Sequence, residues 1–213
     1  FETISGFTST GFTIFSNIKN IDQSLILWRS SIQWIGGLYF LFSIIFLIDI
    51  YDENFKKTLT NFISFNISEI LKQVTKIFLL YSSLTLFIFI VLNFFSIRTF
   101  DSLNLAFTII SSGGFLPVND LSSVIKDNIQ IIVLSFLMLL SFFSIFFTYN
   151  LIFFRKKNIN FFYEDIHLII YYIVIITIFL LFFSFNTSFS VNLLSISSSV
   201  SNIGFSLNSN QPN

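Results

Sequence analysis

Long apolar runs alternate along the chain with shorter polar segments. Four apolar runs have about the 20 residues that a helix needs to cross a bilayer, and they are residues 24–48, 77–95, 129–154 and 166–185. The first run is less regular than the others, because Arg29, Gln33 and the pair Gly36-Gly37 interrupt it. The pattern predicts four membrane-spanning helices.

The polar segments between these runs are of two kinds. Residues 49–76 and 155–165 hold many charges, whereas residues 97–128 and 187–213 are rich in Ser, Thr, Asn and Gly. Seven basic residues fall on the first side, namely Lys56, Lys57, Lys72, Lys76, Arg155, Lys156 and Lys157. Four fall on the other, namely Lys19, Arg29, Arg98 and Lys126. Because basic residues are enriched in cytoplasmic loops, we expect the first side to be cytoplasmic.

Composition narrows the class of protein further. Hydrophobic residues make up 54% of the chain and charged residues 10%, against roughly 25% charged residues in soluble domains. The mean hydropathy is +0.83, and Phe alone occurs 33 times. These values predict an all-α integral membrane protein. A formal net charge of zero argues against a nucleic-acid partner.

The residue types also argue against an enzyme. Cys is absent, so the chain has neither disulfides nor thiolate metal ligands, and His167 is its single histidine. A membrane enzyme should carry several ionisable residues inside its spans, and these spans hold almost none. We therefore expect no catalytic residues and no cofactor.

A short motif occurs three times in the polar segments of the second kind. The sequences are FTSTGFT at 7–13, IISSGGFLP at 109–117 and VSNIGFS at 200–206, in which Gly11, Gly114 and Gly204 align. Each copy follows a short run that is rich in apolar and hydroxyl residues. The second and third copies follow a predicted span, and the first and second precede one. The repeating unit is therefore a span, a half-span, a glycine turn and another span.

The length of the half-span indicates a re-entrant helix. Residues 101–110 would form a helix of about 15 Å, which is half of a ~30 Å hydrocarbon core. Asp101 and Ser102 are candidate N-cap residues for it. Non-helical backbone at membrane depth is tolerated where it is buried in protein or lines a water-filled cavity. The fold predicted thus has about four transmembrane helices and three re-entrant half-helices.

The residue types of the three turns favour cation binding. The C-terminal end of a half-helix dipole stabilises a cation, and glycine lets successive carbonyls point the same way. Carbonyl oxygens can then replace the hydration shell of a monovalent cation. The alternative is close helix packing by small residues, which is the interpretation we prefer for Gly36-Gly37.

Several of these segments resemble the membrane subunit (TrkH-like) of the Trk/Ktr/HKT superfamily of potassium transporters. FETISGFTSTGFT is similar to the first pore loop of that family, LILWRSSIQWIGGLYF to the helix after it, and LNLAFTIISSGGF to the second loop. FFYEDIHLIIYY is similar to the entry into the third unit, and VSNIGFS occupies the third loop. The resemblance implies a potassium-channel-like fold, with four span–pore-loop–span units in one chain.

The resemblance also implies which residues form the ion filter. Gly11, Gly114 and Gly204 match the filter glycines of the family. The carbonyls of the preceding residues would line the ion path together with the residues behind them; the pairs are Thr10 with Ser9, Gly113 with Ser112, and Ile203 with Asn202. A glycine at position 11 goes with potassium in this family, and a serine there goes with sodium. The departures are Gly113, where the first loop has Thr10, and Ile203 in the third loop.

The resemblance assigns an expected place to each part of the chain. Residues 1–48 would be the end of the first unit, 77–154 the second unit and 166–213 the start of the third, with cytoplasmic connections at 49–76 and 155–165. The fourth unit is missing, so we interpret the chain as an internal fragment of a longer protein. Family members are homodimers in the cytoplasmic (inner) membrane, surrounded by lipid, with the filter loops on the outer side. A cytoplasmic nucleotide-binding regulatory subunit is the further partner expected.

Several alternatives remain open from the sequence. Arg29 is either a structural anchor paired with Glu2 or Asp22, or an outer-mouth charge. Potassium preference is the first expectation, with a sodium-permeable or sodium-coupled transporter as the alternative. Channel-like flow and symport are not distinguished. In another class of function, the chain would be a non-conducting membrane scaffold.

Overall fold

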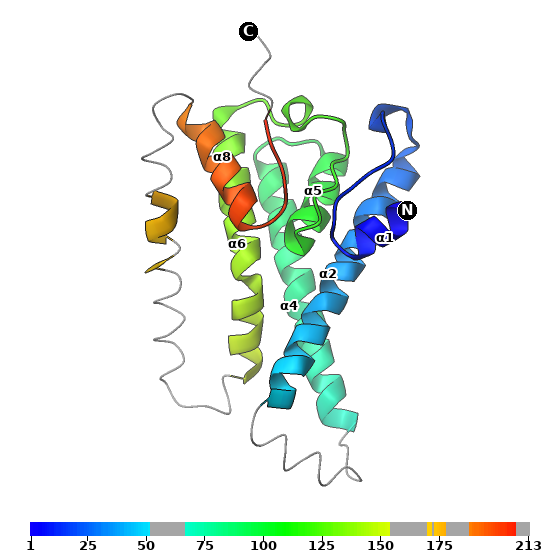
Figure 1. Ribbon diagram of the computed structural model, residues 1–213, viewed down its shortest axis with the longest axis vertical. Coiled ribbons are helices and arrows are strands. Elements are labelled where there is room, and N and C mark those ends of the chain that lie inside the picture. Colours follow the sequence, from blue (N-terminus) through cyan, green and yellow to red (C-terminus); the bar gives the residue numbers. More distant parts are fainter. Residues whose placement is uncertain (52–66, 154–169, 172, 178–187, 208–213) are drawn as a thin grey trace.

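The computed structural model describes residues 1–51, 67–153, 170–171, 173–177 and 188–207. In these ranges the regular elements are all helical (Figure 1). The long helices are α2 (Gln23–Tyr51), α4 (Ile67–Phe94) and α6 (Asn128–Phe153). The short helices are α1 (Glu2–Phe7), α5 (Thr99–Ser111) and α8 (Phe189–Val200), together with the 3₁₀ turns η1 (Ile18–Asn20) and η2 (Leu121–Ser123).

The long helices coincide with the first three predicted spans. Within the described ranges, one segment, Val74–Phe94, has both the length and the apolar composition of a bilayer-crossing helix. Helix α2 continues to Tyr51 and helix α4 begins at Ile67, so both extend into the charged connection predicted at 49–76. Of the fourth predicted span, residues 170–171 and 173–177 are described, and they are helical. The connection at 155–165, with His167 just after it, lies outside the described residues.

The short helices occupy one end of the molecule, the upper part of Figure 1. α5 packs against α2, α4 and α6, whereas α1 packs on α2 and α8 on α6. Leu105, Ala106 and Ile109 of α5 are fully buried in the main apolar core, together with Leu134 of α6 and Leu194 of α8. Most residues of α5 are buried, including the polar Asp101 and Asn104, because three long helices pack against it.

α5 begins earlier than the predicted half-span. Its N-cap is Arg98, so Asp101 and Ser102 lie inside the first turn, and the prediction that they cap the helix was wrong. The reason lies at the end of α4, where Ser96 takes a positive φ of 62° and the Ile97 amide donates to Leu92 O. The chain changes direction within this cap. Helix α5 begins directly after it, without a side-chain hydrogen bond at its N-cap. The helix has 13 residues, which is still far short of a complete span.

Candidate functional site

Each short helix ends in a turn with the same backbone conformation. We name residues 9–11 turn 1, residues 112–114 turn 2 and residues 202–204 turn 3. The first residue of each has a positive φ, of 53° at Ser9, 51° at Ser112 and 56° at Asn202. The aligned glycines also have positive φ, of 76° at Gly11 and 80° at both Gly114 and Gly204. Glycine takes this conformation without the steric cost that a Cβ adds.

The three turns also share their hydrogen bonds. The backbone amides of Thr10, Gly113 and Ile203 donate to the carbonyl oxygens of Ser5, Thr108 and Ser198, respectively, at 2.9, 2.9 and 3.1 Å. The backbone amides of Ser9, Ser112 and Asn202 donate to the carbonyl oxygens of Gly6, Ile109 and Ser199 at 3.0, 3.2 and 3.3 Å. Both bonds together are the Schellman cap of a helix C-terminus. The cap at Ser96 has the same two bonds but is not followed by a second left-handed residue. The added glycine therefore distinguishes the three turns from an ordinary cap.

The turns lie against one another in the order 1, 2, 3. A Cβ on Gly11 would lie 2.7 Å from the carbonyl oxygen of Gly113, and a Cβ on Gly114 would lie 2.7 Å from that of Ile203. The same atom on Gly204 would meet nothing within 4 Å among the described residues. Carbonyl oxygens of turns 2 and 3 thus approach the backbone of the preceding turn, and turn 3 has one open side.

In turns 1 and 2, a hydroxyl group of the short helix contacts the carbonyl oxygen of the residue that follows the aligned glycine. Ser5 Oγ donates to Phe12 O at 2.5 Å, and Thr108 Oγ1 lies 2.9 Å from Phe115 O, at the corresponding place after Gly114. Ser5, Thr108 and Ser198 stand at the same position relative to the aligned glycines. This regularity is visible in the sequence, and it was a signal that the sequence analysis did not use.

Helix α2 packs against the ends of α1 and α5, which lead into turns 1 and 2. A Cβ on Gly36 would lie 2.0 Å from Phe7 O at the end of α1, and one on Gly37 would lie 2.7 Å from Ser111 Cβ at the end of α5. The expected close packing at this glycine pair is therefore confirmed, and its partners include the ends of both short helices. Their C-termini, with the negative ends of their dipoles, reach the middle of α2.

Gln33, one turn before this pair, is a second contact that the sequence analysis missed. Its side chain is fully buried, and Nε2 donates to Gly113 O at 2.5 Å. Its Oε1 lies 3.0 Å from Thr108 Oγ1. The sequence identified Gln33 as a polar interruption of an apolar run, but the position of its partner required the packing of α5 on α2.

Arg29 is buried and paired. It is 2% exposed, and its Nε donates to Glu2 Oε2 at 2.8 Å, so the expected pairing with Glu2 is confirmed. Its Nη2 donates to Thr13 Oγ1 at 3.1 Å, and its guanidinium lies 4.2 Å from the centre of the Phe115 ring. Arg29 therefore anchors α1 and the chain after turn 1 to α2. The alternative role of Arg29 as an outer-mouth charge stays a prediction.

Two carboxyl groups of the short helices have shifted pKa values. Burial raises the pKa of the Glu2 carboxyl, but hydrogen bonds from Ile14 N, Thr13 and Arg29 lower it more, so the pKa lies below its ordinary value. Burial also raises the pKa of Asp101 at the start of α5, against the opposing charge of Arg98. Neither carboxyl lies in a long helix, and Glu2 is expected to remain ionised.

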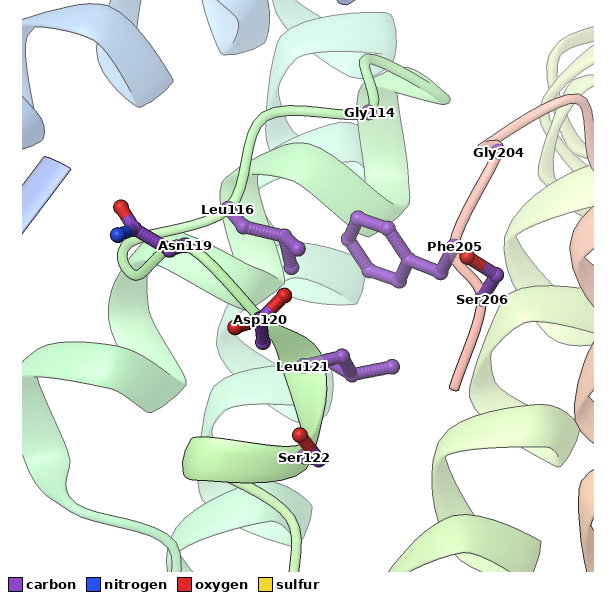
Figure 2. A pocket seen from close by; sticks show the side chains of 9 residues that line it. All are labelled: Gly114, Leu116, Asn119, Asp120, Leu121, Ser122, Gly204, Phe205 and Ser206. Atoms are coloured by element: carbon purple, nitrogen blue, oxygen red, sulfur yellow. The ribbon is translucent and has the colours of Figure 1, made fainter. Parts of the chain in front are cut away.

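A hollow of about 110 Å³ lies between turn 2, the segment that leads to η2, and turn 3. Figure 2 shows Leu116 and Phe205 facing each other across it, with Asp120 on the same side as Leu116. Asn119 at its edge accepts a hydrogen bond from Ile18 N at 2.6 Å, which joins this segment to η1. Gly114 and Gly204 line the hollow, so it opens directly onto two of the turns.

The three turns offer backbone carbonyl and hydroxyl oxygens, and the Asp120 carboxylate lines the adjoining hollow. Across the described residues, His, Asp and Glu form no group of three that could hold a metal ion. The neutral oxygens of the turns suit a weakly held monovalent cation better than a tightly bound divalent one.

Known proteins resemble this chain in both fold and sequence. The crystal structure of the potassium transporter TrkH from Vibrio parahaemolyticus superposes with a TM-score of 0.72 at 16% identity, covering 96% of this chain and 44% of that one. The described residues, all of whose regular elements are helical, therefore share the fold of that structure. No protein-family model matches the chain.

Sequence relatives agree with the structural match. An uncharacterized cation transporter of Methanocaldococcus jannaschii is 27% identical over 154 residues, which are 64% of this chain and 31% of the relative. The Trk system potassium uptake protein TrkH of Halomonas elongata is 22% identical over 178 residues, which are 78% of this chain and 35% of that protein. The chain thus spans about a third of the length of these curated relatives. The resemblance is confirmed: the chain is similar in sequence and in fold to Trk-family potassium transporters.

Proposed function

We propose that turns 1, 2 and 3 form three quarters of a cation filter through which the full-length protein moves potassium across the cytoplasmic membrane. The observation that carries the proposal is the contact of three identical turns in sequence order, with carbonyl oxygens directed at the neighbouring turn. Cation transport is also the activity named for the relatives. A carbonyl cage replaces the hydration shell of a monovalent cation at little cost.

The ligands we propose are the carbonyl oxygens of Thr10, Gly113 and Ile203, supported by Ser9, Ser112 and Asn202. Left-handed residues on either side of each of these positions support this assignment. When left-handed and other conformations alternate, successive carbonyls can point toward the same axis. The C-terminal dipoles of α1, α5 and α8 add to the negative potential at that point.

A fourth turn from the rest of the full-length protein would complete the cage. The open side of Gly204 supports this part of the proposal, because the equivalent sides of Gly11 and Gly114 are each closed by a neighbouring turn. The filter would lie on the outer side of the membrane. A homodimer and a cytoplasmic nucleotide-binding regulatory subunit are the partners we propose, on the resemblance alone.

The test is uptake of potassium and of sodium into liposomes that hold the purified full-length protein. We expect potassium uptake to exceed sodium uptake, with Gly11 setting the preference. Comparable uptake of both ions would favour the alternative, a sodium-permeable or sodium-coupled transporter. No uptake of either ion, in the presence of the regulatory subunit, would favour a non-conducting scaffold and contradict the proposal.

The second loop offers a more specific test of the filter. In Gly114→Asp, the new Cβ would lie 2.7 Å from Ile203 O. The substitution also adds a negative charge at the proposed ion path. We expect altered selectivity or loss of flux with normal membrane insertion. The matched control is Leu86→Ala, at a side chain that is 58% exposed on α4 and remote from the turns. Normal selectivity in Gly114→Asp would contradict the filter assignment for turn 2.

A further inference from the structure

We propose that Gln33 is a positioning residue of turn 2, whose side-chain amide fixes the Gly113 carbonyl and thereby sets the discrimination between monovalent cations. The inference rests on the proposed function, since Gly113 O is one of the proposed ligands. Gln33 itself does not touch the ion path in this assignment; it acts through the carbonyl that it holds.

The geometry of the amide is fixed from both ends. Nε2 donates to Gly113 O at 2.5 Å, and a carbonyl oxygen can only accept, so the orientation of the amide is determined. Oε1 then accepts from Thr108 Oγ1 at 3.0 Å. The same hydroxyl is 2.9 Å from Phe115 O and has one proton to donate at a time. Gln33 thus holds the Gly113 carbonyl on one side of Gly114, while Thr108 donates its one proton either to Gln33 Oε1 or to Phe115 O on the other side.

Gln33 also explains why turn 2 departs from the other two turns. A Cβ on Gly113 would lie 2.4 Å from Gln33 Cδ. Gly113 is not among the glycines with positive φ, so its own backbone could carry a side chain. The equivalent residues do: the hydroxyl of Thr10 bonds that of Thr8 at 2.5 Å, and Ile203 packs into the core. In turn 2, the amide of Gln33 fills the space that a side chain takes in the others.

This contact changes the ligand as well as the packing. The N–H of Gln33 occupies one lone pair of Gly113 O and brings the positive end of a dipole close to it. In a fully buried site, such a hydrogen bond is electrostatically stronger than in water. Selectivity in carbonyl filters depends on the number, the field strength and the freedom of the coordinating carbonyls. An amide that weakens and immobilises one carbonyl therefore changes which cation is preferred.

The first test replaces the amide without changing its size. Gln33→Met removes both hydrogen bonds, and the matched control is Ser31→Ala on the same helix, whose hydroxyl bonds its own helix at Leu27 O. In liposomes with the full-length protein, we expect the ratio of potassium to sodium uptake to change by about fivefold in Gln33→Met and to stay at the wild-type value in Ser31→Ala. An unchanged ratio with normal potassium uptake would overturn the inference.

The second test uses a double-mutant cycle that remains informative if Gln33→Met does not accumulate. Gly113→Ala should reduce potassium uptake by about tenfold, because the added Cβ collides with Gln33. Combining it with Gln33→Ala should restore part of that loss, since the double variant removes the obstruction. Losses that simply multiply would overturn the inference. A wild-type protein that moves neither ion would instead refute the proposed function, so the two failures are distinguishable.

Discussion

A Cβ atom on Gly114 would lie 2.7 Å from the carbonyl oxygen of Ile203, so turn 2 and turn 3 are in direct backbone contact. Turn 1 contacts turn 2 in the same way, through Gly11 and Gly113 O. Gly11 and Gly114 are therefore required for two reasons. Both have a positive φ, and both lie where the backbone of the next turn leaves no room for a side chain.

Gly204 should behave like Gly114 in the full-length protein. Both have φ of 80°, but in this chain only Gly114 meets a neighbouring turn, among the described residues. If a fourth turn closes the cage, Gly114→Ala and Gly204→Ala should each lower potassium uptake by about tenfold or more, because strain and collision act together. The measurement is uptake normalised to protein in the liposomes. A mild effect at Gly204 beside a severe one at Gly114 would contradict the presence of a fourth turn there.

Gly36→Ala should strongly destabilise the protein. The new Cβ would lie 2.0 Å from the backbone oxygen of Phe7, which cannot move without displacing α1 from α2. Overpacking typically costs about 1–3 kcal/mol, and a backbone collision belongs at the upper end. Thermal unfolding of the full-length protein in detergent measures the effect.

Gly6→Ala is the matched control for this substitution. Its Cβ would meet side-chain atoms of Ile32 and Phe115 at 3.2 and 3.3 Å, and these can move slightly. We expect a smaller loss than in Gly36→Ala. Equal losses would show that the close approach of Phe7 O does not limit the packing of α1.

The Arg29–Glu2 pair should be far more sensitive to loss of one partner than of both. Removing one member of a buried pair typically costs about 3–5 kcal/mol, because the other charge is left without compensation. We expect the double variant, which carries Glu2→Gln and Arg29→Met together, to lose less stability than the sum of the losses in the two single variants. Denaturant or thermal unfolding of all four forms gives the coupling. Additive losses would indicate that the two side chains act independently.

The contribution of Glu2 should persist well into the acidic range. Its pKa is lower in the folded protein than its ordinary value of 4.5, so the stability that it supplies is complete above that value. This stability is lost as the pH falls through the lower, folded-state pKa. The difference in melting temperature between wild type and Glu2→Gln should therefore be constant from about pH 7 to pH 5 and shrink only below about pH 4.5. A difference that shrinks near neutral pH would contradict a lowered pKa.

The sequence predicted much of this arrangement, and for identifiable reasons. Apolar runs of about 20 residues are rare outside membranes, so the long helices α2, α4 and α6 followed from length and hydropathy. The three turns followed from the alignment of Gly11, Gly114 and Gly204, because glycine adopts the positive φ found at all three positions without the steric cost of a Cβ. Helix boundaries were less accurate: α5 starts before Asp101, since the cap at Ser96 depends on local backbone geometry that composition does not encode.

The roles of the polar residues in α2 depended on tertiary structure. Arg29 had two candidate partners in the sequence, and the packing of α1 on α2 selected Glu2 over Asp22. Gln33 had no evident partner, because Gly113 lies far along the chain and reaches it only when α5 packs on α2. By itself the sequence determined the class of protein, the long helices and the glycine turns, since these depend on local length, hydropathy and backbone freedom. Tertiary structure alone decided which turns touch and which buried polar groups hold them, because those contacts join residues distant in the sequence.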